Sequence, residues 1–309
     1  MFVSRITFCC TGTESEPWLA GLRAALPQAQ VTLWQPGAPP ADYAVVWAPP
    51  QAFFDEQTQL KGVFNIGAGV DALLRLRLPP QVPIVRLDDA GMAVQMAEYV
   101  CHAVIRHFRE LDRYAADIAQ GQWTFHKPRQ RTDFPVGVMG LGVLGQRVAQ
   151  ALCHFEFPVN GWSRTPKAVD GVRAFSGADQ FDAFLAASRV LVNLLPLTAD
   201  TIDIMNQRSL SRLQPGAYVI NVARGAHLVD DDLLALLDSG HLAGATLDVF
   251  RTEPLPPTHP FWHQSKITIT PHTSARTLRE TSIAQIAAKM AALECGAPVA
   301  GLVEVGRGY

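Results

Sequence analysis

The segment over residues 135–163 restricts the fold of this chain more than any other. An apolar strand, PVGVM, precedes the motif Gly140-Leu141-Gly142-Val143-Leu144-Gly145, and a helical stretch, LGQRVAQALCHF, and a second apolar strand, FPVNGW, follow it. The pattern G-x-G-x-x-G is weak alone, but between a strand and a helix it is typical of the first βαβ unit of a dinucleotide-binding domain. The alternative is a glycine turn with a purely structural role.

Each glycine of the motif has its own physical purpose. Gly140 allows the tight turn, Gly142 lets backbone N–H groups approach a pyrophosphate, and Gly145 brings the helix close to the strand. The positive end of the helix then faces the phosphates. We therefore predict that a dinucleotide binds at Gly140, Gly142, Val143, Leu144 and Gly145.

The end of the second strand indicates which dinucleotide binds. An acidic residue about 20 residues after the motif usually holds the adenosine ribose, but Ser163 stands there, followed by Arg164, Thr165 and Lys167. A hydroxyl does not repel a phosphate, the planar guanidinium suits one, and lysine adds a compact positive charge. These four residues predict NADPH in preference to NADH. The alternative is that Arg164 and Lys167 are solvated loop charges.

The length of 309 residues favours two domains, because single cores usually divide below this size. Short apolar strands alternate with helical stretches, as in parallel sheets covered by helices on both faces. The first part has expected strands at residues 5–8, 31–34, 43–48, 62–66 and 83–87. We predict two doubly wound parallel-sheet α/β domains: a smaller flavodoxin-like substrate domain (1–98 and 277–309) and a Rossmann NAD(P)-binding domain (99–276).

Two long segments have helical periodicity. Residues 90–121 contain no proline and repeat apolar residues at three- and four-residue steps, namely Val94, Ala97, Val100, Cys101, Val104, Phe108 and Leu111. This predicts one long helix that bridges the lobes or pairs with its copy in a homodimer; a buried core helix is an equal alternative. A second amphipathic helix, over 277–296, is expected to pack back on the first lobe.

Composition excludes several classes of protein. The formal net charge is −2 and no basic stripe is present, which argues against a nucleic-acid partner. The N-terminus lacks the features of a signal peptide, and no apolar run approaches the roughly 20 residues that cross a bilayer. The five cysteines have no metal-ligand spacing and are expected to be reduced core residues of a cytoplasmic protein without a metal site: Cys9, Cys10, Cys101, Cys153 and Cys295.

Three later fragments place polar residues directly after apolar strands, at the sheet edge where α/β proteins bind ligands: NVARGAHLVDDDLL, LDVFRTEPLP and TITPHTSA. With them the chain resembles the D-isomer-specific 2-hydroxyacid dehydrogenase family over nearly its whole length, and is most similar to the glyoxylate/hydroxypyruvate reductase A group. The resemblance rests on segments that occur in the same order: GAGVD, DDAGMAVQMAEY, GVLGQRVAQAL, GWSRT, DDDLLALLDSG, LDVF, EPLPP, TPH and the terminal RGY.

The resemblance implies that Arg224, Glu253 and His272 are catalytic. A guanidinium can bind the carboxylate of a 2-oxo acid and polarise the adjacent carbonyl, and an imidazole can donate a proton as hydride arrives. Glu253 would hold the other ring nitrogen and favour the imidazolium. Taken singly, the three residues equally suit a surface arginine, a turn glutamate and a core histidine. The implied reactions are glyoxylate to glycolate and hydroxypyruvate to D-glycerate with NADPH.

The resemblance also implies contacts around the substrate and the nicotinamide ring. In GAGVD, glycines allow the backbone N–H groups of Ala68, Gly69 and Val70 to turn toward a carboxylate. Trp47 either walls the substrate pocket or packs in the core. On the nicotinamide side the implied residues are Leu195, Pro196 and Asp248. Thr273 and Ser274 depart from the apolar residue more usual after the histidine, which bears on hydrogen bonds to the substrate.

Two other functions fit parts of the pattern. One is an NADH-linked D-2-hydroxyacid dehydrogenase of broader range, such as a D-lactate or D-phosphoglycerate enzyme; the missing strand-end acid and the missing regulatory domain argue against it. The other is a dinucleotide-sensing interaction module like the family's transcriptional corepressors. The complete Arg-Glu-His set argues against that class.

Overall fold

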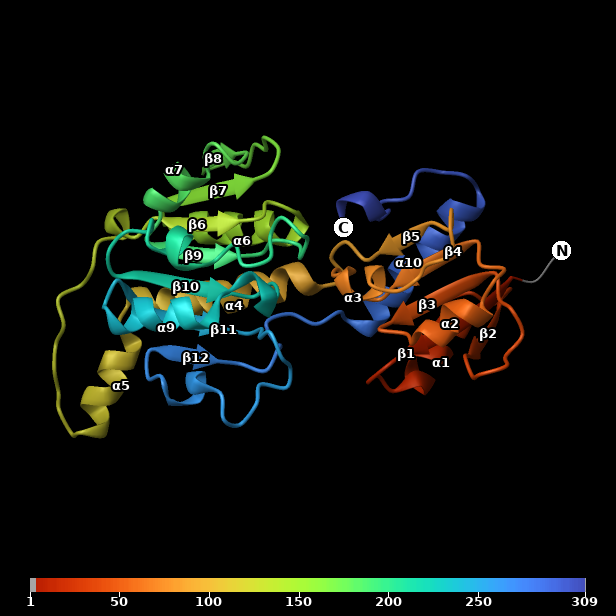
Figure 1. Ribbon diagram of the computed structural model, residues 1–309, viewed down its shortest axis with the longest axis horizontal. Helices are drawn as coiled ribbons and strands as arrows, with labels where there is room; N and C mark the ends of the chain where they lie inside the picture. Colours follow the sequence, from red (N-terminus) through yellow and green to blue (C-terminus); the bar gives the residue numbers. More distant parts are fainter. Residues whose placement is uncertain (1–3, 309) are drawn as a thin grey trace. The chain divides into compact units, whose positions relative to one another are not determined.

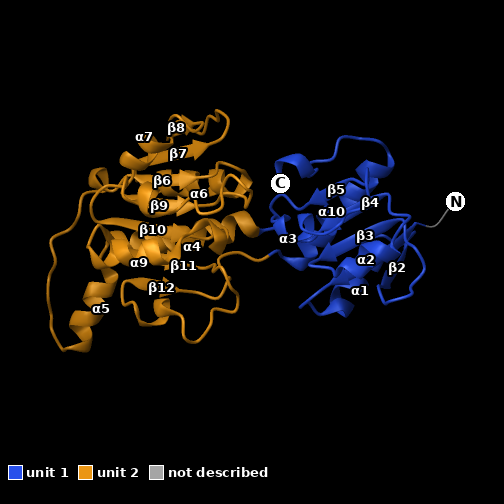
Figure 2. Cartoon of the chain, in the orientation of Figure 1, with its two compact units in different colours: residues 1–91, 277–309 blue, residues 92–276 orange. Residues whose placement is uncertain are grey.

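The computed structural model describes residues 4–308. The chain forms two compact units, shown in Figure 2: unit 1 comprises Met1–Gly91 with Thr277–Tyr309, and unit 2 comprises Met92–Arg276. The expected domain boundary at 98/99 falls inside helix α4 (Met92–Phe108), seven residues beyond the start of unit 2. The assignment of folding domains stays a prediction.

Unit 1 is built on a five-stranded parallel sheet with the order β2-β1-β3-β4-β5. This is the strand order of flavodoxin-like folds. The described side chains of the central strands β3 and β4 are almost all buried, as expected for parallel strands covered on both faces. The strands are β1 (Arg5–Cys10), β2 (Gln30–Leu33), β3 (Tyr43–Trp47), β4 (Gly62–Asn65) and β5 (Ile84–Arg86).

Helix α10 returns the chain to unit 1 after unit 2 is complete. Its residues Ile283, Ile286 and Met290 lie in the same core cluster as Phe8 of β1 and Trp18 of α1. The expectation that this helix packs on the first lobe is confirmed. The helices of unit 1 are α1 (Ser15–Ala25), α2 (Gln51–Glu56), α3 (Asp71–Leu74), α10 (Arg279–Glu294) and the 3₁₀ turn η4 (Val305–Arg307).

Unit 2 is built on a seven-stranded parallel sheet with the order β12-β11-β10-β9-β6-β7-β8 (Figure 1). Counted from β6 as the first strand, the order from the β8 edge is 3-2-1-4-5-6 with a seventh strand added, which is the Rossmann arrangement. Two doubly wound α/β units are thus confirmed. The strands are β6 (Val136–Met139), β7 (Val159–Ser163), β8 (Val172–Ser176), β9 (Val190–Asn193), β10 (Ala217–Asn221), β11 (Leu242–Leu247) and β12 (Ile267–Ile269).

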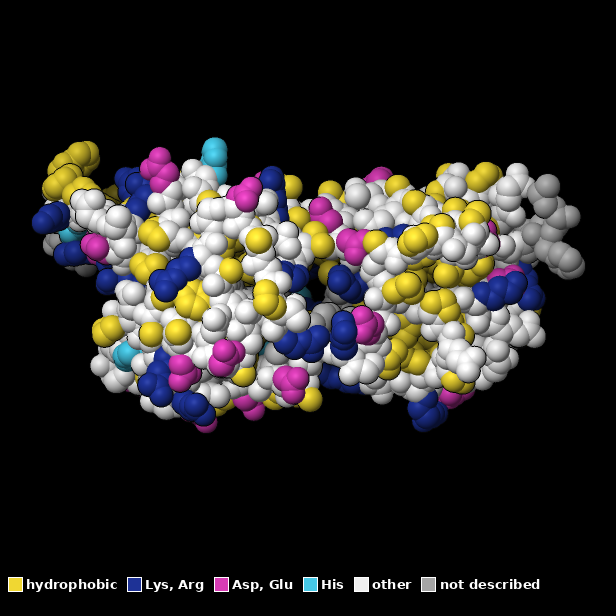
Figure 3. Space-filling model, turned by 90° about the horizontal axis from the view of Figure 1, so that it is seen from above, with side chains coloured by type: hydrophobic (Ala, Val, Ile, Leu, Met, Phe, Trp, Pro, Cys, Tyr) yellow, Lys and Arg dark blue, Asp and Glu magenta, His cyan; other side chains and the backbone are white. Residues whose placement is uncertain are grey.

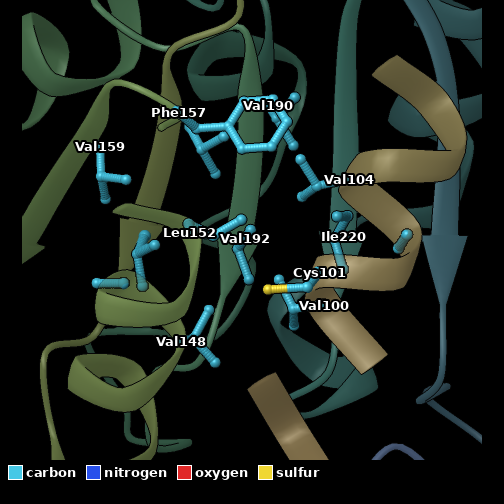
Figure 4. Close-up of a cluster of buried hydrophobic side chains, with 14 of the residues drawn as sticks. Val100, Cys101, Val104, Val148, Leu152, Phe157, Val159, Val190, Val192 and Ile220 are labelled. Atoms are coloured by element: carbon cyan, nitrogen blue, oxygen red, sulfur yellow. The ribbon is translucent and has the colours of Figure 1, made fainter. Parts of the chain in front are cut away.

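Helices α4 and α6 bury their apolar sides in one core cluster of unit 2. In Figure 4, Val100 and Val104 of α4 lie near Val148 and Leu152 of α6 and near side chains of the sheet. Within unit 2, α4 is therefore a core helix. The other helices are α5 (Leu111–Ala119), η1 (Arg131–Asp133), α6 (Val143–His154), α7 (Phe181–Ala186), α8 (Gln207–Leu210), η2 (Gly225–His227), α9 (Asp230–Asp238) and η3 (Pro260–His263).

The prediction of one helix over residues 90–121 is wrong. Helix α4 ends at Phe108 and α5 begins at Leu111, because Glu110 between them has a left-handed backbone with φ of 53°. An α-helix cannot continue through that conformation. Val94 and Leu111, expected on the buried face, are exposed.

The cysteines are only partly as expected. All five are free thiols, and Cys9 and Cys101 are buried. Cys295 is exposed, because it follows the last residue of α10, so its assignment to the core is wrong. Between residues 4 and 308, no helix is long and apolar enough to cross a membrane, and no cluster of His, Cys, Asp or Glu could hold a metal ion.

Candidate active site

The expected site residues of unit 2 follow the carboxyl ends of its strands. Gly140 comes after β6, Leu195 after β9, Arg224 after β10, Asp248 after β11 and His272 after β12. Because all seven strands are parallel, these positions lie along one edge of the sheet. The strand order reverses between β6 and β9, and open α/β sheets bind ligands at such a switch point.

The glycine motif has the geometry that a phosphate cradle needs. Gly140 has φ of +96°, and a Cβ there would lie 2.8 Å from the carbonyl oxygen of Leu194. A Cβ on Gly145 would lie 1.8 Å from the oxygen of Gly140, so only glycine permits this approach of helix to strand. A Cβ on Gly142 would meet no atom within 4 Å, so space is left beside the backbone.

Helix α6 begins at this open position. No side chain caps its first turn, which also contains no acidic residue. The first N–H groups of an α-helix have no partner within the helix, and they carry the positive end of its dipole. The arrangement fits the pyrophosphate of a dinucleotide.

The end of β7 lies next to the motif and is ordered by side chains. Ser163 is buried, and its hydroxyl donates to the carbonyl of Thr165 at 2.8 Å. The Nζ atom of Lys167 donates to the carbonyl of Leu141, inside the motif, at 2.9 Å. Arg164 is exposed. The structure thus brings the turn after β7 and the glycine motif together, and Lys167 is a hydrogen-bonding partner of the motif rather than a free loop charge.

Glu253 and His272 form an ion pair if the imidazole is protonated. Nδ1 of His272 lies 2.8 Å from Oε2 of Glu253, and Oε1 accepts a hydrogen bond from the backbone N–H of Phe250 at 2.9 Å. Burial raises the pKa of the Glu253 carboxyl, but these hydrogen bonds and the charges of His272 and Arg224 outweigh it and hold the pKa below its ordinary value. Glu253 is therefore a carboxylate that orients the ring.

Asp248 holds the segment that carries His272. Its side chain is completely buried, and its two oxygens accept hydrogen bonds from the Thr270 hydroxyl and from the backbone N–H groups of Thr273 and Ser274. The backbone N–H of His272 donates to the Asp248 carbonyl at 2.8 Å. These bonds hold His272 in a left-handed conformation, with φ of 53°, that a non-glycine residue rarely adopts.

Arg224 directly precedes the 3₁₀ turn η2 that follows β10. Its backbone carbonyl accepts from the Asn221 side chain at 3.0 Å, and one guanidinium nitrogen donates to the carbonyl of Ala223. A Cβ on the next residue, Gly225, would lie 1.8 Å from the carbonyl carbon of Phe250. Glycine is therefore required at position 225, where the loop after β10 packs on Phe250, whose backbone N–H binds Glu253.

The GAGVD loop of unit 1 is shaped by Asn65. The Asn65 amide donates to the carbonyls of Gly67 and Gly69 at 2.9 and 3.0 Å. Glycine is required at 67 because a Cβ would lie 2.3 Å from the Trp47 ring. Over residues 4–308, the backbone N–H groups of the next three residues donate to no acceptor, so an anion could accept from Ala68, Gly69 and Val70.

Sequence reasoning missed the buried polar side chains behind these loops. Asn193, Asn221 and His227 are completely buried, and the Asn193 amide donates to both of the other side chains. Tyr99 of α4 bonds the hydroxyl of Thr270, which in turn donates to Asp248. The sequence did offer one signal. Two apolar strands each end in an Asn, and a buried amide must find hydrogen-bond partners nearby.

Two doubly wound units with a phosphate cradle at the switch point define a dinucleotide-binding α/β protein. Comparison with known proteins agrees. The model of the D-isomer specific 2-hydroxyacid dehydrogenase NAD binding domain matches residues 101–274. The glyoxylate/hydroxypyruvate reductase A of Serratia proteamaculans is 53% identical over 303 residues, with 96% of this chain and 97% of the relative covered. That of Yersinia enterocolitica is 48% identical with the same coverage.

Two solved structures are similar along the whole chain. A D-isomer specific 2-hydroxyacid dehydrogenase from Xanthobacter autotrophicus, in complex with NADPH and MES, has a TM-score of 0.95 at 40% identity and covers 100% of both chains. An NADPH-dependent glyoxylate/hydroxypyruvate reductase from Sinorhizobium meliloti, in complex with NADP and sulfate, has a TM-score of 0.93 at 35% identity and covers 99% of this chain and 100% of the other. The present chain belongs to the D-isomer specific 2-hydroxyacid dehydrogenase family, and it is an oxidoreductase with an NAD(P)-binding domain.

Proposed function

We propose that this chain reduces small 2-oxo acids with NADPH, converting glyoxylate to glycolate and hydroxypyruvate to D-glycerate. The observation that carries the proposal is the Glu253–His272 pair near the charge of Arg224. It stands in a chain whose relatives at 44–53% identity have the name glyoxylate/hydroxypyruvate reductase A. A guanidinium can bind and polarise a keto acid, and an imidazole held by a carboxylate can donate the proton that its reduction needs.

The residues of the cofactor site fit NADPH. The open face of Gly142 and the uncapped start of α6 suit the pyrophosphate, with Val143 and Leu144 in the first turn. Ser163 and Thr165 carry no negative charge, and Arg164 offers a planar set of donors to an additional phosphate. Leu195 and Pro196 are proposed to contact the nicotinamide ring, and the contact of Asp248 with its carboxamide stays a prediction.

Each proposed catalytic side chain has a separate task. The Arg224 guanidinium binds the carboxylate of the substrate and polarises its carbonyl. NADPH, when bound, supplies the hydride that reduces the carbonyl carbon. Since Nδ1 of His272 faces Glu253, the Nε2 atom donates a proton to the carbonyl oxygen as negative charge develops there. Glu253 stabilises the protonated ring before transfer.

The GAGVD loop contributes backbone donors. Among the described residues, the neighbouring N–H groups of Ala68, Gly69 and Val70 donate to no acceptor. They are proposed to form an anion-binding backbone site that the substrate carboxylate occupies. Trp47 packs against Gly67 and so fixes the shape of this loop. It also belongs partly to the core of unit 1, so both expected roles remain for this residue.

A spectrophotometric assay tests the proposed function. NADPH oxidation at 340 nm is measured with glyoxylate, hydroxypyruvate and pyruvate, and the series is repeated with NADH. We expect kcat/KM to be highest for the first two acids with NADPH. Faster turnover of pyruvate with NADH would favour the NADH-linked D-2-hydroxyacid dehydrogenase instead, and binding of NADPH without turnover of any 2-oxo acid would refute an enzymatic role.

We also propose that the protein is a homodimer. Helix α5 and the segment after it expose large apolar side chains, with Ile118 72%, Phe125 81% and Trp123 103% exposed. Figure 3 shows hydrophobic side chains at the end of unit 2 where Figure 1 places this segment. Apolar side chains exposed together mark interaction surfaces, and a second copy is the proposed partner. The free thiols fit a cytoplasmic location.

A further inference from the structure

A buried polar network in unit 2 joins two loops of the candidate site. Asn193 ends β9, Asn221 ends β10, and His227 ends the 3₁₀ turn η2. The Nδ2 atom of Asn193 donates to Oδ1 of Asn221 at 3.0 Å and to Nδ1 of His227 at 2.9 Å. All three side chains have 0% exposure. Burial of three polar side chains is costly unless each has its partners.

On one side, the network holds the loop after β9. Oδ1 of Asn193 accepts from the backbone N–H of Leu195 at 3.2 Å, and Nε2 of His227 lies 3.3 Å from the carbonyl oxygen of Pro196. Leu195 and Pro196 are the residues proposed to contact the nicotinamide ring. The backbone N–H of Leu195 and the carbonyl of Pro196 are thus both held by side chains of the network.

On the other side, the network holds the loop after β10. Oδ1 of Asn221 accepts from the backbone N–H of Ala223 at 3.2 Å, and its Nδ2 donates to the carbonyl of Arg224 at 3.0 Å. The backbone N–H of His227 also donates to that carbonyl, at 3.3 Å. The backbone position of Arg224 therefore depends on two members of the network.

The backbone partners determine the orientation of every side chain in the network. The backbone N–H of Leu195 requires the oxygen of the Asn193 amide, so the nitrogen of that amide faces His227. Nδ1 of His227 must then accept, and the proton of the neutral ring stands on Nε2, where it faces the Pro196 carbonyl. No other assignment satisfies all of these groups, and a fully satisfied buried network is rigid.

We infer that Asn193, Asn221 and His227 are positioning residues that fix the substrate-binding Arg224 relative to the nicotinamide loop. The inference rests on the proposed function, in which Arg224 binds the 2-oxo acid and Leu195–Pro196 contact the cofactor. His227 is the central member of the network, since its ring connects Asn193 with Pro196.

Two substitutions of His227 separate the two sides of the network. Leucine in H227L removes both ring nitrogens, so within residues 4–308 the Asn193 amide keeps only Asn221 as an acceptor and the Pro196 carbonyl keeps only the Thr201 hydroxyl as a side-chain donor. Asparagine in H227N can still accept from Asn193 but cannot reach Pro196. The matched control is H241L, because His241 also bonds a backbone carbonyl through Nε2, that of Leu210 at 3.2 Å, and precedes β11 at the opposite sheet edge.

The test measures kcat and KM for glyoxylate and for NADPH, the NADPH Kd by fluorescence titration, and thermal unfolding. For H227L we expect kcat/KM for glyoxylate to fall about 10- to 100-fold, with both KM values raised. For H227N we expect the KM for glyoxylate within about threefold of the unmutated protein, while the KM and Kd for NADPH stay raised. A positioning role predicts this division, which a general loss of stability would not produce.

Several results would overturn the inference. These are unchanged kinetics in H227N, a fall in kcat with both KM values unchanged in H227L, or equal effects of H227L and H241L. If H227L does not fold, the KM and Kd values of H227N test the inference without it. Absence of turnover in the unmutated protein would refute the proposed function instead, and the NADPH titration of H227N would then still test the Pro196 side.

Discussion

Nδ1 of His272 lies 2.8 Å from Oε2 of Glu253, and the other oxygen of this carboxylate is held by the backbone N–H of Phe250. One ring nitrogen is thereby committed to the protein. The second nitrogen, Nε2, is left as the only ring atom that could donate a proton to a substrate. The side chain of His272 is 44% exposed, so a small ligand can reach it.

Replacement of His272 by alanine tests this assignment. We expect kcat to fall roughly 10²- to 10⁴-fold, the usual contribution of a positioned acid. NADPH binding, measured by fluorescence, should be retained. The matched control is His259→Ala, because His259 also pairs with a carboxylate, that of Asp230 at 3.3 Å, outside the proposed catalytic set. Near-normal turnover in His272→Ala would mean that another group donates the proton.

Replacement of Glu253 by glutamine preserves the shape of the side chain but removes its charge. The imidazolium that is proposed to donate the proton then loses its charged partner, so we expect kcat/KM for glyoxylate to fall roughly tenfold while NADPH binding is retained. An unchanged kcat/KM would contradict the proposed pairing.

The same variant has a pH-dependent effect on stability. The pKa of Glu253 is below its ordinary value of 4.5 in the folded protein, so the ion pair stabilises the fold above that pH and is lost as the pH falls through the depressed pKa. The difference in melting temperature between Glu253→Gln and the unmutated protein should therefore shrink in acid.

The turn after β7 is expected to select the cofactor. Arg164→Asp places a negative charge where the additional phosphate of NADPH is proposed to bind, so KM for NADPH should rise more than KM for NADH. A Ser163→Asp and Arg164→Ile pair should act in the same direction. Arg208→Asp makes the same change of charge at an exposed position of α8 and serves as the control. Equal kinetics with both cofactors in the unmutated protein would refute our account of this turn.

Much of the fold could be predicted because its signals are local. The glycine motif of unit 2 sits between a strand and a helix as expected, and the structure gives Gly140 and Gly145 separate steric reasons, while Gly142 leaves open space. The break between α4 and α5 could not be predicted, because residues 90–121 contain no proline and keep helical periodicity. Glu110 has a left-handed conformation and accepts a hydrogen bond from Arg129, a contact 19 residues along the chain that local periodicity does not reveal.

The sequence suggested candidate reactive side chains for the site but not the side chains that support them. Arginine, glutamate and histidine after strands suggest chemistry by their type, whereas Asn193, Asn221 and His227 suggest it only when their partners are known. Asp248 illustrates the same limit: the resemblance implied a cofactor contact, but the structure shows its carboxylate occupied by Thr270, Thr273 and Ser274. Such contacts join residues more than twenty positions apart.

The exposed apolar segment after α5 predicts an oligomeric state. Trp123→Ser with Phe125→Ser removes apolar area from the proposed dimer interface, so we expect the fraction of dimer in sedimentation velocity to fall at micromolar concentration. Trp262, which is 50% exposed and lies in η3, provides the control as Trp262→Ser. A monomeric unmutated protein would refute the homodimer, and an unaffected dimer in the double variant would place the interface elsewhere.

Two glycines of the same motif should respond in opposite ways to one methyl group. In Gly145→Ala the new Cβ would lie 1.8 Å from the Gly140 oxygen, a backbone atom that cannot move without displacing α6, so we expect unfolding to become easier by about 1–3 kcal/mol or more. In Gly142→Ala the Cβ meets no atom within 4 Å and the backbone angles suit alanine, so stability should be unchanged. The methyl group instead occupies the space proposed for the pyrophosphate, and the Kd for NADPH should rise at least tenfold. Urea unfolding and fluorescence titration of both variants check the pair. A stable Gly145→Ala would contradict the steric argument for glycine at this position, and a Gly142→Ala variant with normal NADPH affinity would show that the dinucleotide does not bind against this turn.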